Sequence, residues 1–191
     1  MHKSLSYKIL AALMAAGSFG LYTAAPAAAD GVTLANNNTI LCANGNDVVI
    51  NGNELTSPVM TDKPNLSNVS EVYGIGYKYG NTNFTDTAYD GNVEINGSTF
   101  GWVYGGFTSG ENATANNNTV TLNGSNINYV YGGQSISGSA DTNTVTITGG
   151  NYGTVTGGDA NSDKAVGTAN NNNISIRGNA VINDCIMGGI G

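Results

Sequence analysis

The stretch "NTVTLNGSNINYVYGGQSISGSADTNTVTITGG", residues 118–150, decides the fold, because it holds one complete copy of a repeat and the start of the next. Val120 and Leu122 alternate with polar residues, which is the period-two pattern of a half-buried strand. A glycine, Gly124, comes two residues later, and a second short strand leads into a glycine pair at 132–133. The same pattern begins again at Val145.

Working outward from this stretch, the pattern occurs in five copies. The first strand of each copy is a strand-like triplet with apolar first and third residues, followed by a glycine two residues on: Val48–Ile50, Val93–Ile95, Val120–Leu122, Val145–Ile147 and Ile174–Ile176. The second strand of each copy has, in turn, the sequence "EVYGI" (71–75), "WVYGG" (102–106), "YVYGG" (129–133), "TVTGG" (154–158) and "CIMGG" (185–189). From the second copy on, successive copies are spaced by 25 to 29 residues, and the link between the first two copies is longer.

Repeats of this length, made of short strands and glycine turns, are typical of a solenoid in which each copy forms one coil. The sequence therefore predicts an all-β, right-handed parallel β-helix of about five coils, with 25–29 residues in each. Stacked coils place equivalent residues about 4.8 Å apart, so the valines and isoleucines form continuous apolar columns. A single coil cannot bury its own apolar stripe, which explains why the pattern repeats.

The chain divides into three parts. Residues 1–29 have a basic start, an apolar run and the small-residue pattern "AAPAAA", which predicts a secretory signal peptide cleaved near Ala29. Residues 30–47 form an N-terminal cap segment, and residues 48–191 form the solenoid. Two longer stretches, 53–68 and 77–92, are expected to bulge outward as loops. The first contains Pro58 and Pro64, and proline is tolerated in turns but excluded from central strands.

The motifs in residues 92–117 and 118–150 closely resemble the passenger repeats of bacterial autotransporter adhesins, which read N-x-V-x-I-x-G-G, then V-Y-G-G, then a loop ending in A-x-x-N. The resemblance implies a parallel β-helix that is secreted and displayed at the bacterial cell surface, delivered by an outer-membrane translocator barrel. This chain reaches Gly191 with no alternating barrel strands. We therefore expect a passenger domain that is incomplete at its C-terminal end.

Charge and composition exclude several functions. The net charge of −7, which becomes more negative once the signal peptide is removed, argues against nucleic acid as a partner. The only histidine, His2, lies in the predicted signal peptide, so catalytic triads and histidine-containing zinc sites are not possible in the mature chain. We predict no enzyme activity and no cofactor.

Carboxylates are the remaining route to catalysis, since β-helices include polysaccharide lyases and hydrolases. Glu94 is aligned with Thr121, Thr146 and Ser175 in the next coils, so it has no carboxylate partner in its column. Asp159 and Asp163 are close in sequence but lie in what reads as a polar loop without an arginine. The lyase or hydrolase stays an alternative on these residues.

Metal binding and ice binding are each suggested by one pattern and opposed by its surroundings. "DANSD" at 159–163 starts like a calcium loop, but Lys164 and Asn170 replace the glycine and the glutamate that such a loop needs, so no metal site is predicted. Outward threonines at 119, 121, 144 and 146 resemble an ice-binding array that the flanking coils interrupt. Ordinary strand propensity explains them.

Aromatic residues form the best candidate contact surface. Trp102 and Tyr129 occupy one outward column with Thr154 and Cys185, and a neighbouring column contains Tyr73, Tyr104, Tyr131, Thr156 and Met187. The candidate contact residues are Tyr73, Trp102, Tyr104, Tyr129 and Tyr131, which also have the simpler interpretation of rings stacking along a solenoid. Cys42 and Cys185 are too many coils apart to form a disulfide with each other.

The sequence thus predicts an exported, non-catalytic, adhesin-like passenger that contacts a host-cell glycan or protein. A polysaccharide lyase or hydrolase and a purely structural surface spacer are the alternatives.

Overall fold

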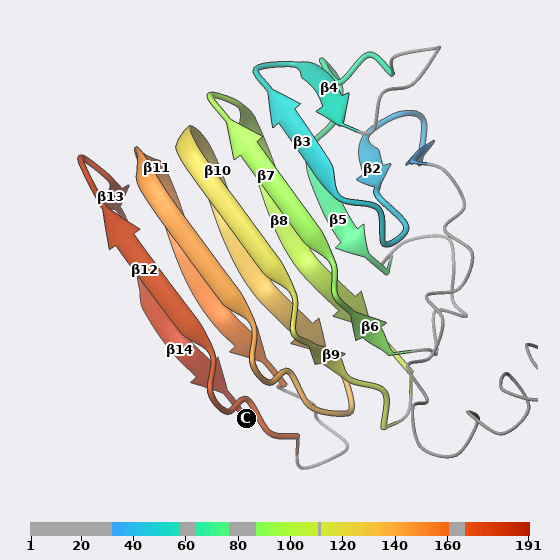
Figure 1. Cartoon of the computed structure of the whole chain (residues 1–191), viewed down its shortest axis with the longest axis vertical. Helices are drawn as coiled ribbons and strands as arrows, with labels where there is room; N and C mark the ends of the chain where they lie inside the picture. The colour runs from blue at the N-terminus through green and yellow to red at the C-terminus, as the bar shows by residue number, and fades with distance from the viewer. Residues whose placement is uncertain (1–31, 58–63, 77–86, 111, 161–166) are drawn as a thin grey trace, which may run out of the picture.

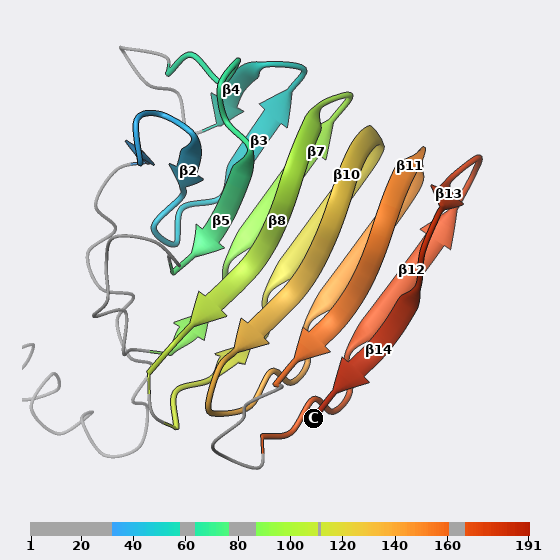
Figure 2. The same cartoon turned by 180° about the vertical axis from the view of Figure 1, so that it is seen from behind.

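A computed structural model describes residues 32–57, 64–76, 87–110, 112–160 and 167–191. These residues form strands and turns without any helix, and their strands stack into a parallel β-solenoid. In Figures 1 and 2 the strands lie in two layers that run in opposite directions, so that each coil goes up one layer and returns down the other. The predicted all-β solenoid is confirmed.

One layer contains the first strand of every coil. It is built from β3 (Val48–Asn51), β7 (Asn92–Asn96), the first part of β10 (Thr119–Ser135), the first part of β11 (Thr144–Asp159) and β12 (Asn173–Arg177). All of these neighbours pair in parallel, with Val48, Val93, Val120, Val145 and Ile174 in register. The five predicted triplets therefore stack one above another.

The second layer contains the return strand of every coil. Its members are β5 (Glu71–Ile75), β8 (Thr99–Thr108), the later parts of β10 and β11, β13 (Val181–Ile182) and β14 (Ile186–Ile190). Val72, Val103, Val130, Val155 and Ile186 are in register here. Both columns point between the layers, where all their members except the exposed Ile186 belong to or pack against a single apolar core.

Glycines at the corner between the layers have the backbone conformation that the turn needs. Gly97, Gly124 and Gly149 have φ values of 67°, 59° and 67°, in the left-handed region that costs other residues free energy. The glycine pairs serve a different purpose. A Cβ at Gly132 would lie 2.3 Å from the carbonyl oxygen of Gly157, so the pair allows neighbouring coils to approach closely.

Three asparagines, Asn118, Asn143 and Asn172, form side-chain hydrogen bonds inside the turn at the opposite end of the strands. Asn143 is fully buried, and its amide nitrogen donates to the carbonyl oxygen of Ala115 at 2.9 Å, while its Oδ1 accepts the backbone N–H of Asn118 at 2.9 Å. Asn172 makes the same pair of bonds to Ala140 and Asn143. Each asparagine thus ties its own coil to the preceding one and satisfies backbone groups that would otherwise be buried without partners.

Three short strands cover the N-terminal end of the solenoid, and two of them pair antiparallel. β2 (Ile40–Cys42) pairs in parallel with β5, and β1 (Thr33–Ala35) pairs antiparallel with β2. β4 (Glu54–Ser57) pairs antiparallel with β3 and buries Leu55. The stretch 53–68 was expected to be a loop, and this part of it is instead a strand, because Leu55 gains a place against the core.

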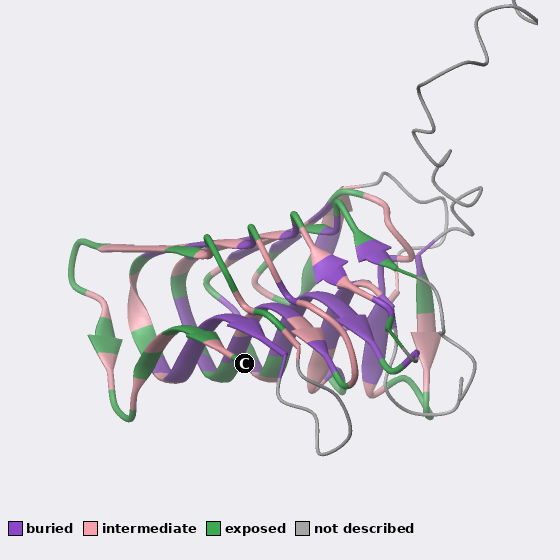
Figure 3. Cartoon of the chain, turned by 90° about the horizontal axis from the view of Figure 1, so that it is seen from below, coloured by how far each residue is buried: buried purple, intermediate pink, exposed green. Residues whose placement is uncertain are grey.

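At the other end, the last coil is more exposed. Figure 3 shows buried residues concentrated in the middle coils, whereas intermediate and exposed residues dominate β12, β13 and β14. Two further short strands, β6 (Ala88–Tyr89) and β9 (Ala115–Asn116), pair in parallel beside the lower turns in Figure 1.

The predicted signal peptide, residues 1–29, lies outside the described residues. Within the described ranges, no helix has the length and apolar character needed to cross a membrane.

Candidate contact surface

Trp102 and Tyr129 form an exposed aromatic pair on the outside of the second layer. They are in register on β8 and β10, and their rings stack with centroids 5.6 Å apart and planes 11° from parallel. Trp102 is 37% exposed and Tyr129 is 38% exposed. The predicted outward column is therefore confirmed at these two positions.

The column changes character on both sides of this pair. Glu71 is in register with Trp102 on one side, and Thr154 is in register with Tyr129 on the other. Thr154 is buried, and its hydroxyl donates to Oδ2 of Asp184 at 2.7 Å. The exposed aromatic surface is thus limited to coils two and three.

The neighbouring column is not exposed as the sequence analysis expected. Tyr73 is 0% exposed and Tyr104 is 2% exposed, so neither side chain is accessible to a partner. Their rings stack at 4.6 Å, and Tyr131 continues the stack at 5.0 Å from Tyr104. The simpler interpretation, stacking along the solenoid, is correct for Tyr73 and Tyr104.

Phe107 is the reason for this burial that the sequence analysis missed. It packs edge-on against Tyr73 and Tyr104, with centroid distances of 6.1 Å and 5.9 Å. Together with Ile40 and Cys42 these rings form a second apolar cluster on the outer face of the layer. Each aromatic pair in such a cluster contributes about 0.5–1.5 kcal/mol beyond its buried area. Phe107 directly follows "WVYGG" in the sequence, and this apolar residue is the feature from which the burial of Tyr73 and Tyr104 could have been predicted.

Tyr131 lies at the edge of this cluster and is half-buried. Burial raises the pKa of its hydroxyl, and the nearby charge of Asp159 raises it further. Asp159 was expected in a polar loop but is a buried residue at the end of β11, where Oδ2 accepts a hydrogen bond from Gln134 at 2.7 Å. The strand continues to this residue because its backbone pairs with Gln134 of β10 on one side and with Ile190 of β14 on the other.

A groove runs beside the exposed pair, at the bend where the return strand begins. It has a volume of about 420 Å³ and is lined by apolar side chains, including Phe100, Ile127 and Tyr152, and by polar residues and glycines, including Thr99, Gly101, Asn126, Asn128, Asn151 and Asn183. Gly101 and Asn128 line the groove and immediately precede Trp102 and Tyr129 in the sequence, but the two aromatic residues themselves do not line it. None of the residues that line it is charged. The groove could not be predicted from the sequence, because a bend between two outward residues leaves no mark in the strand pattern.

The asparagines of the groove are partly engaged with one another. Asn126 and Asn151 are in register, and the amide of Asn151 donates to Oδ1 of Asn126 at 2.9 Å. Asn128, in the part of the chain that the structure describes, makes no side-chain hydrogen bond and is exposed. It therefore presents both an amide donor and a carbonyl acceptor to solvent.

The candidate catalytic and metal residues do not come together in the described part of the chain. Glu94 stacks on Thr121 as aligned, and its carboxylate accepts a hydrogen bond from Asn96 at 3.0 Å. Asp163 and Lys164 lie outside the described residues. Among the residues that are described, no group of three or more His, Cys, Asp or Glu side chains could hold a metal ion.

The two cysteines are free thiols, in agreement with the sequence analysis. Cys42 is buried, and desolvation raises the pKa of its thiol to about 11, although a hydrogen bond to Thr33 acts in the opposite direction. Cys185 is half-buried and approaches the Thr154 hydroxyl at 3.6 Å.

The threonine array is interrupted as predicted. Thr119 and Thr144 are in register with Asn92 on one side and Asn173 on the other.

No protein-family model, no curated protein and no solved structure matches this chain. The resemblance to autotransporter passengers therefore rests on the repeat motifs alone.

Proposed function

We propose that this chain is an exported, non-catalytic contact protein of the autotransporter-passenger type, which binds a glycan or protein on a host cell through Trp102 and Tyr129. The exposed stacked pair is the observation that carries the proposal. Two large rings that stay partly exposed to water do not contribute the full stabilisation that their burial would give. Tryptophan and tyrosine are also the side chains that most often dominate binding energy at interfaces.

The buried state of the neighbouring aromatic column supports the proposed contact role of Trp102 and Tyr129. Tyr73 and Tyr104 show that this fold can bury aromatic columns under a side chain such as Phe107. Trp102 and Tyr129 have no such cover among the described residues and remain more than a third exposed. A purely structural role would be served equally well by burying them.

Export and delivery belong to the proposal as well. The signal peptide at residues 1–29 would direct the chain out of the cytoplasm, and an outer-membrane translocator barrel would carry it to the cell surface. The rigid solenoid would then hold the contact pair away from the membrane.

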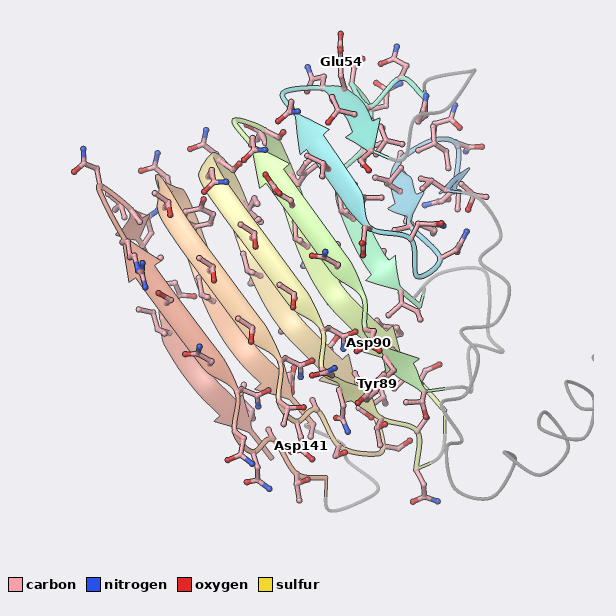
Figure 4. The ribbon with its side chains drawn as sticks, viewed as in Figure 1. Glu54, Tyr89, Asp90 and Asp141 are labelled. Carbon is pink, nitrogen blue, oxygen red and sulfur yellow. The ribbon has the colours of Figure 1, made fainter. Side chains whose placement is uncertain are left out.

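The experiment is retention of the purified chain on host cells. We expect a variant carrying both Trp102→Ala and Tyr129→Ala to lose most of its retention, about tenfold or more, because the contact area is removed. Tyr89→Ala is the matched control, since Tyr89 is an aromatic residue that is 50% exposed and lies on β6, beside Asp90 near the lower turns in Figure 4, and it is not among the residues that line the groove. Equal retention of the double variant and the wild type would overturn the proposal.

A further inference from the structure

The groove at the bend of the return strands crosses all five coils. Each coil contributes the residues at its own bend, which are Val69 and Ser70, then 99–101, 126–128, 151–153 and Asn183. Strand pairing stacks these segments in order, since Asn126 lies opposite Thr99 on one side and opposite Asn151 on the other. The groove is therefore a trough parallel to the solenoid axis, with a length of four strand spacings, about 19 Å.

The bend itself is a repeated backbone feature. The carbonyl of Ser70 accepts the N–H of Gly101 at 2.7 Å and also that of Trp102 at 3.1 Å. One coil earlier, the carbonyl of Thr39 accepts the N–H groups of Ser70 and Glu71 in the same way. Two consecutive donors on one acceptor are typical of a β-bulge, which bends a strand and changes the direction of its side chains. The trough thus follows a row of stacked bulges.

Two positions along the trough have no side chain. Gly101 and Gly153 lie beside Asn128 in the two neighbouring coils, because the residues before and after them pair with those around Asn128. A Cβ on Gly153 would lie 2.4 Å from the carbonyl oxygen of Asn128, and one on Gly101 would lie 3.2 Å from that of Ser70. The Asn128 side chain therefore stands between two open positions that are two strand spacings, about 9.6 Å, apart.

Amide groups are available beside both open positions. Asn128 is exposed and makes no side-chain hydrogen bond within the described ranges, so it offers a donor and an acceptor. The bond from Asn151 to Asn126 leaves the N–H groups of Asn126 and the carbonyl oxygen of Asn151 available among the described residues. The trough can therefore both donate hydrogen bonds to a ligand and accept them from it.

We propose that this groove binds an extended, uncharged, β-1,4-linked glycan that lies parallel to the solenoid axis, with its hydroxyls bonded to Asn126, Asn128 and Asn151. The two open positions are separated by about the length of one disaccharide in such a chain, so alternate sugar units fit at Gly101 and Gly153. Sugar hydroxyls both donate and accept, as the amides do. The groove is a separate site from the Trp102–Tyr129 pair, and the inference goes beyond the proposed function.

Charge and sheet pairing argue against other ligand classes. The groove lining is uncharged, and the charged residues next to its two ends in the sequence, Glu71 and Asp184, are both acidic. An acidic glycan or a nucleic acid would therefore be repelled. An extended peptide would need a free strand edge to pair with. β8 and β10, which cross the groove, are each paired on both sides and offer no such edge.

The test is a calorimetric titration of the purified chain with tetrasaccharides. The β-1,4-linked probes are those of glucose, mannose and N-acetylglucosamine, the α-1,4-linked glucose tetrasaccharide represents a coiled chain, and tetragalacturonate is the acidic probe. We expect at least one β-1,4-linked probe to bind and the last two not to bind. The matching disaccharide should bind at least about tenfold more weakly, because it reaches only half of the groove. No binding of any β-1,4-linked probe, or equal binding of the α-linked or acidic probe, would overturn the inference.

Three variants locate the binding. Asn128→Ala removes the central amide and should weaken binding about tenfold. Gly101→Asn gives the second coil the side chain that the third coil has at this position, and it should abolish binding by filling one open position. Asn92→Ala is the matched control and should bind like the wild type, since Asn92 is an exposed strand residue of the other layer. Circular dichroism checks the fold of each variant. Wild-type affinity of Asn128→Ala would overturn the inference even if Gly101→Asn failed to fold.

Failure of this inference is distinguishable from failure of the proposed function. If no β-1,4-linked tetrasaccharide binds but host-cell retention depends on Trp102 and Tyr129, the contact function stands and the glycan groove is wrong. If a tetrasaccharide binds and Asn128→Ala weakens it, but host cells do not retain the chain, the glycan groove stands and the host-contact proposal is wrong.

Discussion

The third coil and the last coil have the same sequence pattern and very different surroundings. Val120 and Val130 of the third coil are completely buried, because a coil lies on each side of them. Ile174 of the last coil is only half-buried, and Ile186 is 52% exposed. This difference shows that the stability of each coil depends on the coils beside it, as expected for a repeat protein in which each repeat contacts only its neighbours.

Charged substitutions give the largest expected difference between the two coils. Val130→Asp places an unpaired carboxylate in the core and should cost more than about 4 kcal/mol, which unfolds the region. Ile186→Asp puts the same group where water can reach it and should cost less than about 1 kcal/mol. Urea denaturation followed by circular dichroism measures both. Equal losses would contradict the view that neighbouring coils, rather than the motif itself, decide burial.

The apolar columns could be predicted from sequence because they depend only on spacing. Once Val120 and Val145 are aligned, parallel stacking places all equivalent residues in register, and the structure confirms this from Val48 to Ile174. The outward columns were harder. Alternation says that Tyr73 points away from the core, but it says nothing of Phe107, which covers Tyr73 from the side.

The candidate site shows the same limit. Trp102 and Tyr129 were predicted to be exposed because they occupy outward positions, and they are. The groove beside them depends on the angle of the bend at Gly101, Asn128 and Gly153, which spacing does not specify.

The buried asparagines provide a second test of the comparison. Asn143 has a coil on both sides and Asn172 has one, so Asn143→Ala should cost about 2–4 kcal/mol and Asn172→Ala about half as much. The cost arises because buried backbone groups such as the carbonyl of Ala115 lose their partner. Urea denaturation of the two variants measures the difference, with Asn126→Ala as a control in the exposed asparagine pair. A larger loss for Asn172→Ala would reverse the expected order.

The two thiols extend the comparison to reactivity. Cys42 is buried within the N-terminal cap segment, and its thiol has a pKa raised to about 11, so at pH 8 only roughly a thousandth of it is the reactive thiolate. Cys185, in the last coil, is half-buried and should react with a disulfide reagent about a hundredfold faster. Absorbance kinetics at pH 8 should show one fast thiol in the folded chain and two after unfolding in urea. Cys185→Ser should remove the fast phase, and its persistence would show that Cys42 is the accessible thiol.

The smallest expected effect concerns the turn that links the coils. Thr142 has a φ of 58°, in the left-handed region that is unfavourable for a β-branched residue. The equivalent turn residues in the flanking coils, Asn117 and Asn171, adopt φ values of 60° and 55° with a side chain that tolerates this conformation better. Thr142→Asn should therefore stabilise the chain by about 1 kcal/mol, which raises its melting temperature by roughly 2–4 °C.

The control for this substitution is Thr144→Asn, two residues later in β11, where an extended backbone favours threonine over asparagine. It should lower the melting temperature slightly, although Asn173 occupies the corresponding position in the last coil. If both substitutions stabilise the chain, asparagine is favoured for its side-chain hydrogen bonds along the solenoid and not for its backbone conformation. If only Thr142→Asn does so, the turn geometry is the cause, and the A-x-x-N motif is explained by two separate requirements: a residue that accepts a positive φ, followed by a buried amide that joins the coils.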